Sequence, residues 1–372
     1  MKVLILANQQ LGLYKFRKEL IEEMVSCGHR VYVSVPEDEF TENIKGLGCM
    51  MIPNRQLDRR GKNPLHDLKL IRCYIRLMKK INPDVVLTYT IKPNVYGGMA
   101  CSILRIPYVS NITGLGTSIE NGGFISFITI LLYRIGAKRA QTVFFQNREN
   151  CQYMLDRHVV DKEKSRLIPG SGVNTTLHCY EPYPSDENGI IITTITRIMK
   201  DKGIDEIIEA AECIKKDHPE VRFLLIGDFD EDYEKEINVL DKRGIIRYLG
   251  IQKDVHPYIA RSHAVLHASY HEGMSNVLQE AASTGRPVLA TNVPGCREIF
   301  EDNVTGIGFK PKDTKDLIRA VKRFLNLKNE RREEMGRYGR EKMVREFDRS
   351  IVIKKYKEEI RKAERVNDTR II

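Results

Sequence analysis

Short apolar runs alternate with amphipathic stretches along most of the chain. In the first half, six such runs predict strands at residues 2–7, 31–35, 50–53, 85–89, 108–112 and 142–145. Apolar positions with helical spacing predict helices between them, at residues 16–27, 65–81 and 95–104. Strands that are apolar almost throughout, with helices between them, indicate a parallel sheet that is covered on both faces.

The same alternation restarts after residues 185–189, a segment rich in polar and acidic residues that we interpret as a linker. Beyond it, strands are predicted at residues 190–196, 221–227, 246–249, 264–267 and 287–291, helices at 205–216 and 276–284, and a helical end at 315–363. The 372 residues therefore predict an α/β protein with two Rossmann-like, doubly wound domains that face a cleft, at residues 1–175 and 176–348.

The segment HEGMSNVLQE, which follows a predicted strand of the second domain, carries the strongest candidate chemistry. A helix capped here would direct the free N–H groups of Ser275, Asn276 and Val277 at an anion such as a diphosphate. The carboxylate of Glu272, eight residues before Glu280, can accept hydrogen bonds from sugar hydroxyls. The alternative is that Glu272 ends a strand and Glu280 is a solvated helix residue. The strand–loop–helix context favours a binding site.

This segment resembles the Glu-x7-Glu motif of the retaining glycosyltransferases of glycosyltransferase family 4. Further matches are Thr196-Arg197 followed by Lys202-Gly203, Leu225-Ile226-Gly227, Gly285-Arg286-Pro287-Val288, Pro294-Gly295, and Gly306 as a later turn with Phe309 after it. The resemblance covers about residues 1–345 and implies the two-domain GT-B fold. It also implies that a C-terminal helix, at residues 349–372, packs back on the N-terminal domain.

The resemblance implies a role for each matching residue. Arg197 and Lys202 would neutralise the diphosphate of a nucleotide-sugar. Glu280 would accept the ribose hydroxyls, and Glu272 would hold the hydroxyls of the donor sugar. Gly12, in the loop after the first strand, would let the backbone approach the phosphates. The alternative is that the two cations are ordinary surface charges and that Gly12 is a turn residue.

A narrower resemblance concerns the acceptor. The segments RRGKNP, TIKPN and NITGLG of the first domain resemble a bacterial branch that adds sugars to undecaprenyl-diphosphate-linked acceptors in capsule, O-antigen and glycan assembly. It implies that Arg59, Arg60, Lys62 and Lys92 meet the acceptor diphosphate. Many family members carry a His in the first domain that contacts the donor sugar. The corresponding loop here has no His, and Thr113 is the candidate in its place.

Charge is unevenly distributed along the chain. The net charge of +10 combines +10 over residues 1–170, −5 over residues 171–330 and +5 over residues 331–372. A basic half indicates an anionic partner, and the resemblance supplies one, a diphosphate-lipid acceptor at a membrane. The apolar run at residues 124–135 is too short to span a bilayer but can lie in its interface. The alternative is a buried Rossmann helix.

Other classes of protein fit these residues less well. Apolar and charged contents of 42% and 30% exclude a disordered chain. The eight cysteines show no zinc-ligand spacing and indicate reduced thiols in a cytosolic protein. Asp228 and Asp230 form an Asp-x-Asp pair, but Arg197 and Lys202 already supply positive charge. We therefore expect activity without a metal or another cofactor. No nucleic-acid-binding module accompanies the basic residues.

The function that the resemblance implies is a retaining transfer of a hexose or N-acetylhexosamine from a UDP-sugar to an undecaprenyl-diphosphate-linked saccharide, in surface polysaccharide biosynthesis. The resemblance implies front-face transfer, in which the donor phosphate draws off the acceptor proton. The expected partners are the nucleotide-sugar, the lipid-linked acceptor and the inner face of the cytoplasmic membrane, where the protein would be peripheral; nucleic acid is not expected. The alternative is a non-hydrolysing UDP-sugar epimerase of the same fold, which needs no acceptor.

Overall fold

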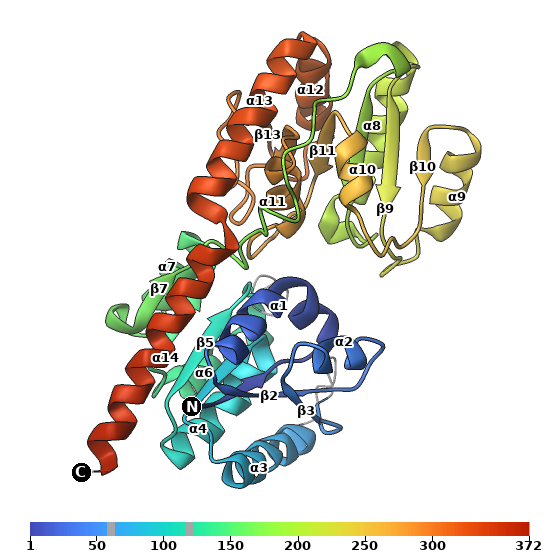
Figure 1. Cartoon of the computed structure of the whole chain (residues 1–372). Helices are drawn as coiled ribbons and strands as arrows, with labels where there is room; N and C mark the ends of the chain where they lie inside the picture. The colour runs from blue at the N-terminus through green and yellow to red at the C-terminus, as the bar shows by residue number, and fades with distance from the viewer. Residues whose placement is uncertain (58–63, 117–118, 120–121, 372) are drawn as a thin grey trace. The chain divides into compact units, whose positions relative to one another are not determined.

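The computed structural model describes residues 1–57, 64–116, 119 and 122–371, and the chain divides into two compact units (Figure 1). Unit 1 comprises Met1–Ser171 and Ser350–Ile372, and unit 2 comprises Gly172–Arg349. The sequence pattern predicts boundaries at 175/176 and 348/349, whereas the units meet at 171/172 and 349/350. The backbone N–H of Val173 donates to the carbonyl of Phe347, and that of Arg349 donates to Val173, both at 2.9 Å. These bonds tie both boundary segments into unit 2.

Unit 1 is built on a parallel sheet with strand order β3-β2-β1-β4-β5-β6-β7. The strands are β1 (Lys2–Leu6), β2 (Arg30–Val35), β3 (Met50–Pro53), β4 (Val85–Tyr89), β5 (Tyr108–Ile112), β6 (Thr142–Phe145) and β7 (Ser165–Leu167). Every residue of β4, β5 and β6 is buried. Such burial requires helices on both faces of the sheet, and it explains why these strands are apolar almost throughout.

Two sets of helices cover the sheet of unit 1. One face packs against α3 (Pro64–Ile81), the π-helical turn η1 (Pro93–Gly97), α4 (Gly98–Leu104), α6 (Gly123–Ala137) and α7 (Arg148–Asp156). The other face packs against α1 (Gln10–Ser26), α2 (Thr41–Lys45) and the C-terminal helix α14 (Arg349–Ile371). In α14, the Tyr356 hydroxyl accepts a hydrogen bond from Asn111 Nδ2 at 2.7 Å, and the Tyr356 ring packs edge-on against Phe144.

Unit 2 repeats this architecture with a parallel sheet in the order β10-β9-β8-β11-β12-β13. Its strands are β8 (Ile191–Ile195), β9 (Arg222–Ile226), β10 (Ile246–Tyr248), β11 (Ala264–His267), β12 (Val288–Thr291) and β13 (Gly306–Phe309). One apolar core lies under α8 (Ile204–Asp217), α9 (Glu234–Lys242), α12 (Thr314–Leu325) and α13 (Asn329–Lys342). The other lies under α10 (His256–Arg261), α11 (Asn276–Ser283) and the π-helical turn η5 (Met343–Phe347). Both units therefore have the Rossmann-like, doubly wound fold.

Two predictions about glycines are wrong. Helix α1 begins at Gln10 and not at residue 16, because the carboxylate of Asp38 accepts a hydrogen bond from the Gln10 N–H at 3.2 Å. Gly12 therefore lies in the first turn of a helix and not in a loop. Gly306 is the first residue of strand β13 and not part of a turn; a Cβ there would lie 2.5 Å from the carbonyl oxygen of Val288 on the neighbouring strand.

Candidate active site

Lys202 is held in place by the glycine that follows it. It ends the 3-10 turn η4 (Lys200–Lys202), and Gly203 then adopts a φ of +70°. A Cβ at Gly203 would lie 2.3 Å from the carbonyl oxygen of Ala268, in the loop after β11. Only glycine lets η4 lie so close to that loop. The Lys-Gly pair thus brings Lys202 to the carboxyl end of β11.

Lys202 pairs there with Glu272. Its Nζ lies 2.6 Å from Glu272 Oε1 and 3.2 Å from the hydroxyl of Ser269. The two charged side chains are only 15% and 16% exposed. A buried ion pair costs much desolvation energy, so its position at the end of the central strands marks this place for function more than for stability.

His267, the last residue of β11, completes the cluster and was not predicted. Its Nε2 lies 3.0 Å from Glu272 Oε1 and 3.4 Å from the hydroxyl of Ser275. The ring is 4% exposed. A polar residue that ends the otherwise apolar strand AVLH, directly before the candidate loop, was the available signal.

Opposing effects set the pKa of Glu272. Burial alone would raise it, but the charge of Lys202 and the hydrogen bond with His267 outweigh burial and hold the pKa well below its usual range. Glu272 is therefore a carboxylate at neutral pH. It is an acceptor of hydrogen bonds, as a group that binds sugar hydroxyls must be.

Helix α11 begins beside this cluster. Ser275 caps it, since its hydroxyl accepts a hydrogen bond from the N–H of Leu278 at 3.4 Å. The prediction that the Ser275 N–H is free for an anion is wrong, because this group donates to the carbonyl of Gly295 at 2.8 Å. Gly295 has a φ of +82°, and a Cβ there would lie 2.8 Å from the carbonyl oxygen of Glu272. The Pro-Gly pair thus fixes the loop between Glu272 and the first turn of α11, where Asn276 and Val277 lie.

Glu280 lies in α11, and its side chain is 17% exposed. Its Oε1 lies 3.9 Å from Nε2 of His178, another polar residue that was not predicted. The ring of His178 packs edge-on against His256 at 5.4 Å. Glu280 is consequently a partly buried carboxylate and not the solvated helix residue of the alternative interpretation.

Arg197 does not join the Lys202 cluster in this structure. Its Nη1 donates to Asp230 at 2.5 Å, and its side chain is 51% exposed. Asp230 is the second acid of the Asp-x-Asp pair, so one of the two candidate metal ligands contacts an arginine. Within the described ranges, the side chains with the spacing of a metal site are instead Cys179, Glu181 and His256.

The predicted residues of unit 1 are placed only in part. Lys92 is half-buried, and its Nζ lies 2.9 Å from the carboxylate of Asp67. Thr113 follows β5 in a loop and is half-buried. Arg59, Arg60 and Lys62 lie outside the described residues.

Comparisons with known proteins agree with this architecture. The model for "Glycosyl transferase 4-like" proteins matches residues 2–147, and the model for "Glycosyl transferases group 1" matches residues 181–342. The chain is 26% identical over 342 residues to N,N'-diacetylbacillosaminyl-diphospho-undecaprenol alpha-1,3-N-acetylgalactosaminyltransferase of Campylobacter jejuni, with 87% of this chain and 89% of that protein covered. It is 23% identical over 277 residues to UDP-Gal:alpha-D-GlcNAc-diphosphoundecaprenol alpha-1,3-galactosyltransferase of Escherichia coli, with 70% of both covered.

Among solved structures, the chain is similar to the Anabaena protein HepE in complex with UDP and glucose. The TM-score is 0.79 at 20% identity, over 96% of this chain and 98% of that one. This similarity concerns the fold. The chain belongs to the GT-B glycosyltransferases, with a glycosyl transferase 4-like domain followed by a group 1 glycosyl transferase domain.

Proposed function

We propose that this glycosyltransferase moves a hexose or N-acetylhexosamine from a UDP-sugar to an undecaprenyl-diphosphate-linked saccharide, with retention of the anomeric configuration. One observation carries the proposal: a buried lysine–glutamate–histidine cluster lies beside the first turn of α11. Two cited relatives, in Campylobacter jejuni and Escherichia coli, are named as transferases that act on diphospho-undecaprenol-linked sugars. Neither relative is an epimerase, and nothing in the site favours that alternative.

Each side chain of the site has a part in this proposal. Lys202 neutralises charge that develops on the leaving diphosphate, aided by the N–H groups of Asn276 and Val277. Glu272 accepts hydrogen bonds from the donor sugar, and Glu280 accepts them from the ribose. Arg197 exchanges Asp230 for the diphosphate when donor binds, which its 51% exposed side chain permits. The donor phosphate takes the proton of the acceptor hydroxyl, so the protein contributes orientation and charge stabilisation.

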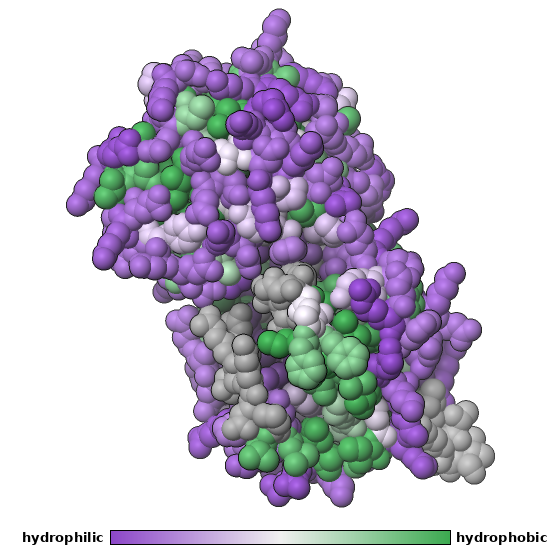
Figure 2. Space-filling view, turned by 180° about the vertical axis from the view of Figure 1, so that it is seen from behind, coloured by the Kyte–Doolittle hydropathy of each residue, from purple (hydrophilic) through white to green (hydrophobic). Residues whose placement is uncertain are grey.

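We further propose that helix α6 rests on the membrane that holds the acceptor. This helix exposes six large apolar side chains: Phe124, Ile125, Phe127, Ile128, Leu131 and Ile135. Figure 2 shows hydrophobic residues gathered on one part of the surface. A buried Rossmann helix would hide these groups, and an exposed apolar area of this kind marks an interaction surface. No helix of the described residues is both long and apolar enough to cross a membrane.

Transfer to a synthetic acceptor tests the proposal. The protein is incubated with a panel of UDP-sugars and a diphosphate-linked saccharide on a polyprenyl chain, and the product is analysed by mass and by the anomeric coupling in its NMR spectrum. We expect one added sugar with the anomeric configuration of the donor. An inverted product, or epimerised donor with no product, would overturn the proposal. The same assay is carried out with Lys202→Ala. Its matched control is Lys200→Ala, which removes an exposed lysine two residues from Lys202.

A further inference from the structure

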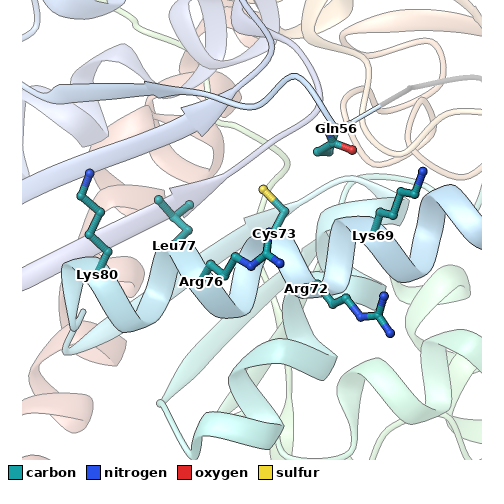
Figure 3. A pocket seen from close by; sticks show the side chains of 7 residues that line it. All are labelled: Gln56, Lys69, Arg72, Cys73, Arg76, Leu77 and Lys80. Carbon is teal, nitrogen blue, oxygen red and sulfur yellow. The ribbon is translucent and has the colours of Figure 1, made fainter.

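A groove of about 560 Å³ follows helix α3 of unit 1, and none of the predicted site residues that the structure describes lines it (Figure 3). The groove is lined by Gln56, Lys69, Arg72, Cys73, Arg76, Leu77 and Lys80. Figure 3 shows that its cations come from successive turns of α3, with Cys73 between them. The four cations are Lys69, Arg72, Arg76 and Lys80. Their spacing of three, four and four residues places all of them on one side of the helix.

None of these four cations makes a hydrogen bond or ion pair with another described residue, and all four are exposed. The one acid of α3, Asp67, is already bound to Lys92 and to the Tyr96 hydroxyl, at 2.9 and 2.7 Å. Like charges spaced by one turn destabilise a helix. Lys80 sits in the last turn, where a cation complements the helix dipole. That explanation does not extend to Lys69, Arg72 and Arg76, so an anionic ligand is the better account of them.

Exposed apolar side chains on α3 and on the neighbouring helix α4 indicate the kind of ligand. Leu65 and Leu68, at the start of α3, are 69% and 46% exposed, and Ile103 of α4 is 62% exposed. Helix α4 packs against both α3 and α6, so the groove and the apolar side of α6 belong to one helical layer. Free cations next to exposed leucine, isoleucine and phenylalanine complement a bilayer interface, which offers phosphates beside acyl chains.

We propose that the α3 groove binds the phosphate groups of anionic phospholipids. This inference rests on the proposed function, because it gives the membrane a specific contact on unit 1 besides the apolar side of α6. The guanidinium groups of Arg72 and Arg76 bind lipid phosphates bidentately, and Lys69 and Lys80 add point charges at either end. The thiol of Cys73, whose pKa burial raises, stays neutral in the groove.

Vesicle co-sedimentation tests the groove without donor or acceptor. The full chain is mixed with phosphatidylcholine vesicles that contain or lack phosphatidylglycerol. The test variant is Arg72→Glu with Arg76→Glu. The control variant is Lys79→Glu with Lys253→Glu, which changes the net charge equally at two exposed lysines outside the groove. Thermal unfolding verifies that both variants fold. We expect the test variant to lose at least about twentyfold in affinity for anionic vesicles, and the control less than about threefold.

Other outcomes would contradict the proposal that the groove binds anionic phospholipids. Equal losses in both variants would indicate a general effect of surface charge, and equal wild-type affinity for both kinds of vesicle would leave α6 as the sole contact. We expect vesicle binding to persist in excess inorganic pyrophosphate at constant ionic strength. Release would instead assign the groove to a soluble diphosphate. Failure of the proposed function is recognised separately, as the absence of sugar transfer.

A different observation, in unit 2, supports a second inference. We infer that His267 is a positioning residue for Glu272, which also rests on the proposed function. Its buried Nδ1 has no hydrogen-bond partner among the described residues. The neutral ring with its hydrogen on Nε2 therefore fits the site, because a proton on Nδ1 would be a buried donor without an acceptor. That hydrogen fixes Glu272 Oε1, on which Lys202 also converges.

Steady-state hydrolysis of the donor tests this role. In His267→Gln an amide N–H replaces the Nε2 donor, whereas His267→Phe keeps a ring and removes the donor. We expect His267→Phe to lower kcat about tenfold or more with little change in KM. We expect His267→Gln to keep most of the wild-type kcat. A folded Phe variant with wild-type kcat, or a Gln variant as slow as Phe, would overturn the inference. An inactive wild-type protein would instead refute the proposed function.

Discussion

Each unit has a parallel sheet between two layers of helices, but the charged clusters of the two units differ in their exposure to solvent. Unit 1 leaves four cations of α3 exposed and without ion pairs to described residues, next to helices with exposed apolar side chains. Unit 2 buries Lys202 against Glu272 and His267 at the carboxyl end of β11. One architecture thus carries an exposed cationic surface, which we propose meets a bilayer, and a buried ionic cluster, which we propose binds a small anionic ligand.

This difference shows why the net charge of each half does not indicate how strongly its individual cations interact. The exposed cations of the basic half stay in water, where salt weakens the interactions of each beyond about 10 Å. The acidic half needs few cations because burial strengthens each of them. Substitutions should therefore act locally and strongly in unit 2, and gradually, through membrane affinity, in unit 1.

The largest effect is expected at Lys202. Lys202→Ala should lower donor turnover by about a thousandfold, roughly 4 kcal/mol of transition-state stabilisation. It should also reduce the free energy of unfolding by about 3 kcal/mol, because it leaves the Glu272 charge buried without its main partner. Kinetics and urea unfolding measure the two effects. Lys200→Ala should change stability by no more than about 0.5 kcal/mol, and equal effects of the two variants would remove the contrast between buried and exposed cations.

A smaller effect is expected at α6. Phe124→Asp with Phe127→Asp should lower the affinity for phosphatidylglycerol-containing vesicles at least about tenfold, because two large apolar side chains no longer enter the interface. Val239→Asp with Ile251→Asp changes two exposed apolar residues of unit 2 and should leave vesicle binding unchanged. Co-sedimentation of both variants decides the matter, and unchanged binding of the α6 variant would show that α6 is not a membrane contact.

The pH dependence of stability should report on Glu272. Its pKa is lower in the folded than in the unfolded protein, so its stabilisation is complete above its ordinary value of 4.5 and is lost as the pH falls below it. Urea unfolding between about pH 3 and 7 should show a steeper decline below about pH 5 for the wild type than for Glu272→Gln. Parallel curves would show that Glu272 has no lowered pKa.

The smallest effect is expected from chelation. Sugar transfer should proceed at the same rate in EDTA, because Lys202 and the N–H groups of α11 supply the positive charge, and Asp230 of the Asp-x-Asp pair contacts Arg197. Rates with and without added Mg²⁺ or Mn²⁺ measure this directly. Loss of turnover in EDTA, restored by either ion, would move catalysis from the lysine cluster to a metal.

The sequence predicts most of the fold because buried parallel strands are apolar almost throughout, and the strands from β1 to β6 lie where their apolar runs predict them. The short helices α2, α9 and α10 lack a long apolar stripe and were not predicted. Glu272 and Glu280 were recognisable from their spacing. His267 was not, because its role depends on the fold of the loop that returns Glu272 to the end of β11. The pairing of Arg197 with Asp230 also depends on tertiary structure, since it joins the ends of two neighbouring strands.

The most direct test of the central claim is incubation of the protein with single UDP-sugars and no acceptor, followed by separation of nucleotides and sugars. If the Lys202–Glu272–His267 cluster holds a donor sugar, one or a few UDP-sugars will be hydrolysed slowly to UDP and free sugar, and Glu272→Ala will abolish this hydrolysis. An epimerised UDP-sugar, or hydrolysis at the wild-type rate in Glu272→Ala, would contradict the account.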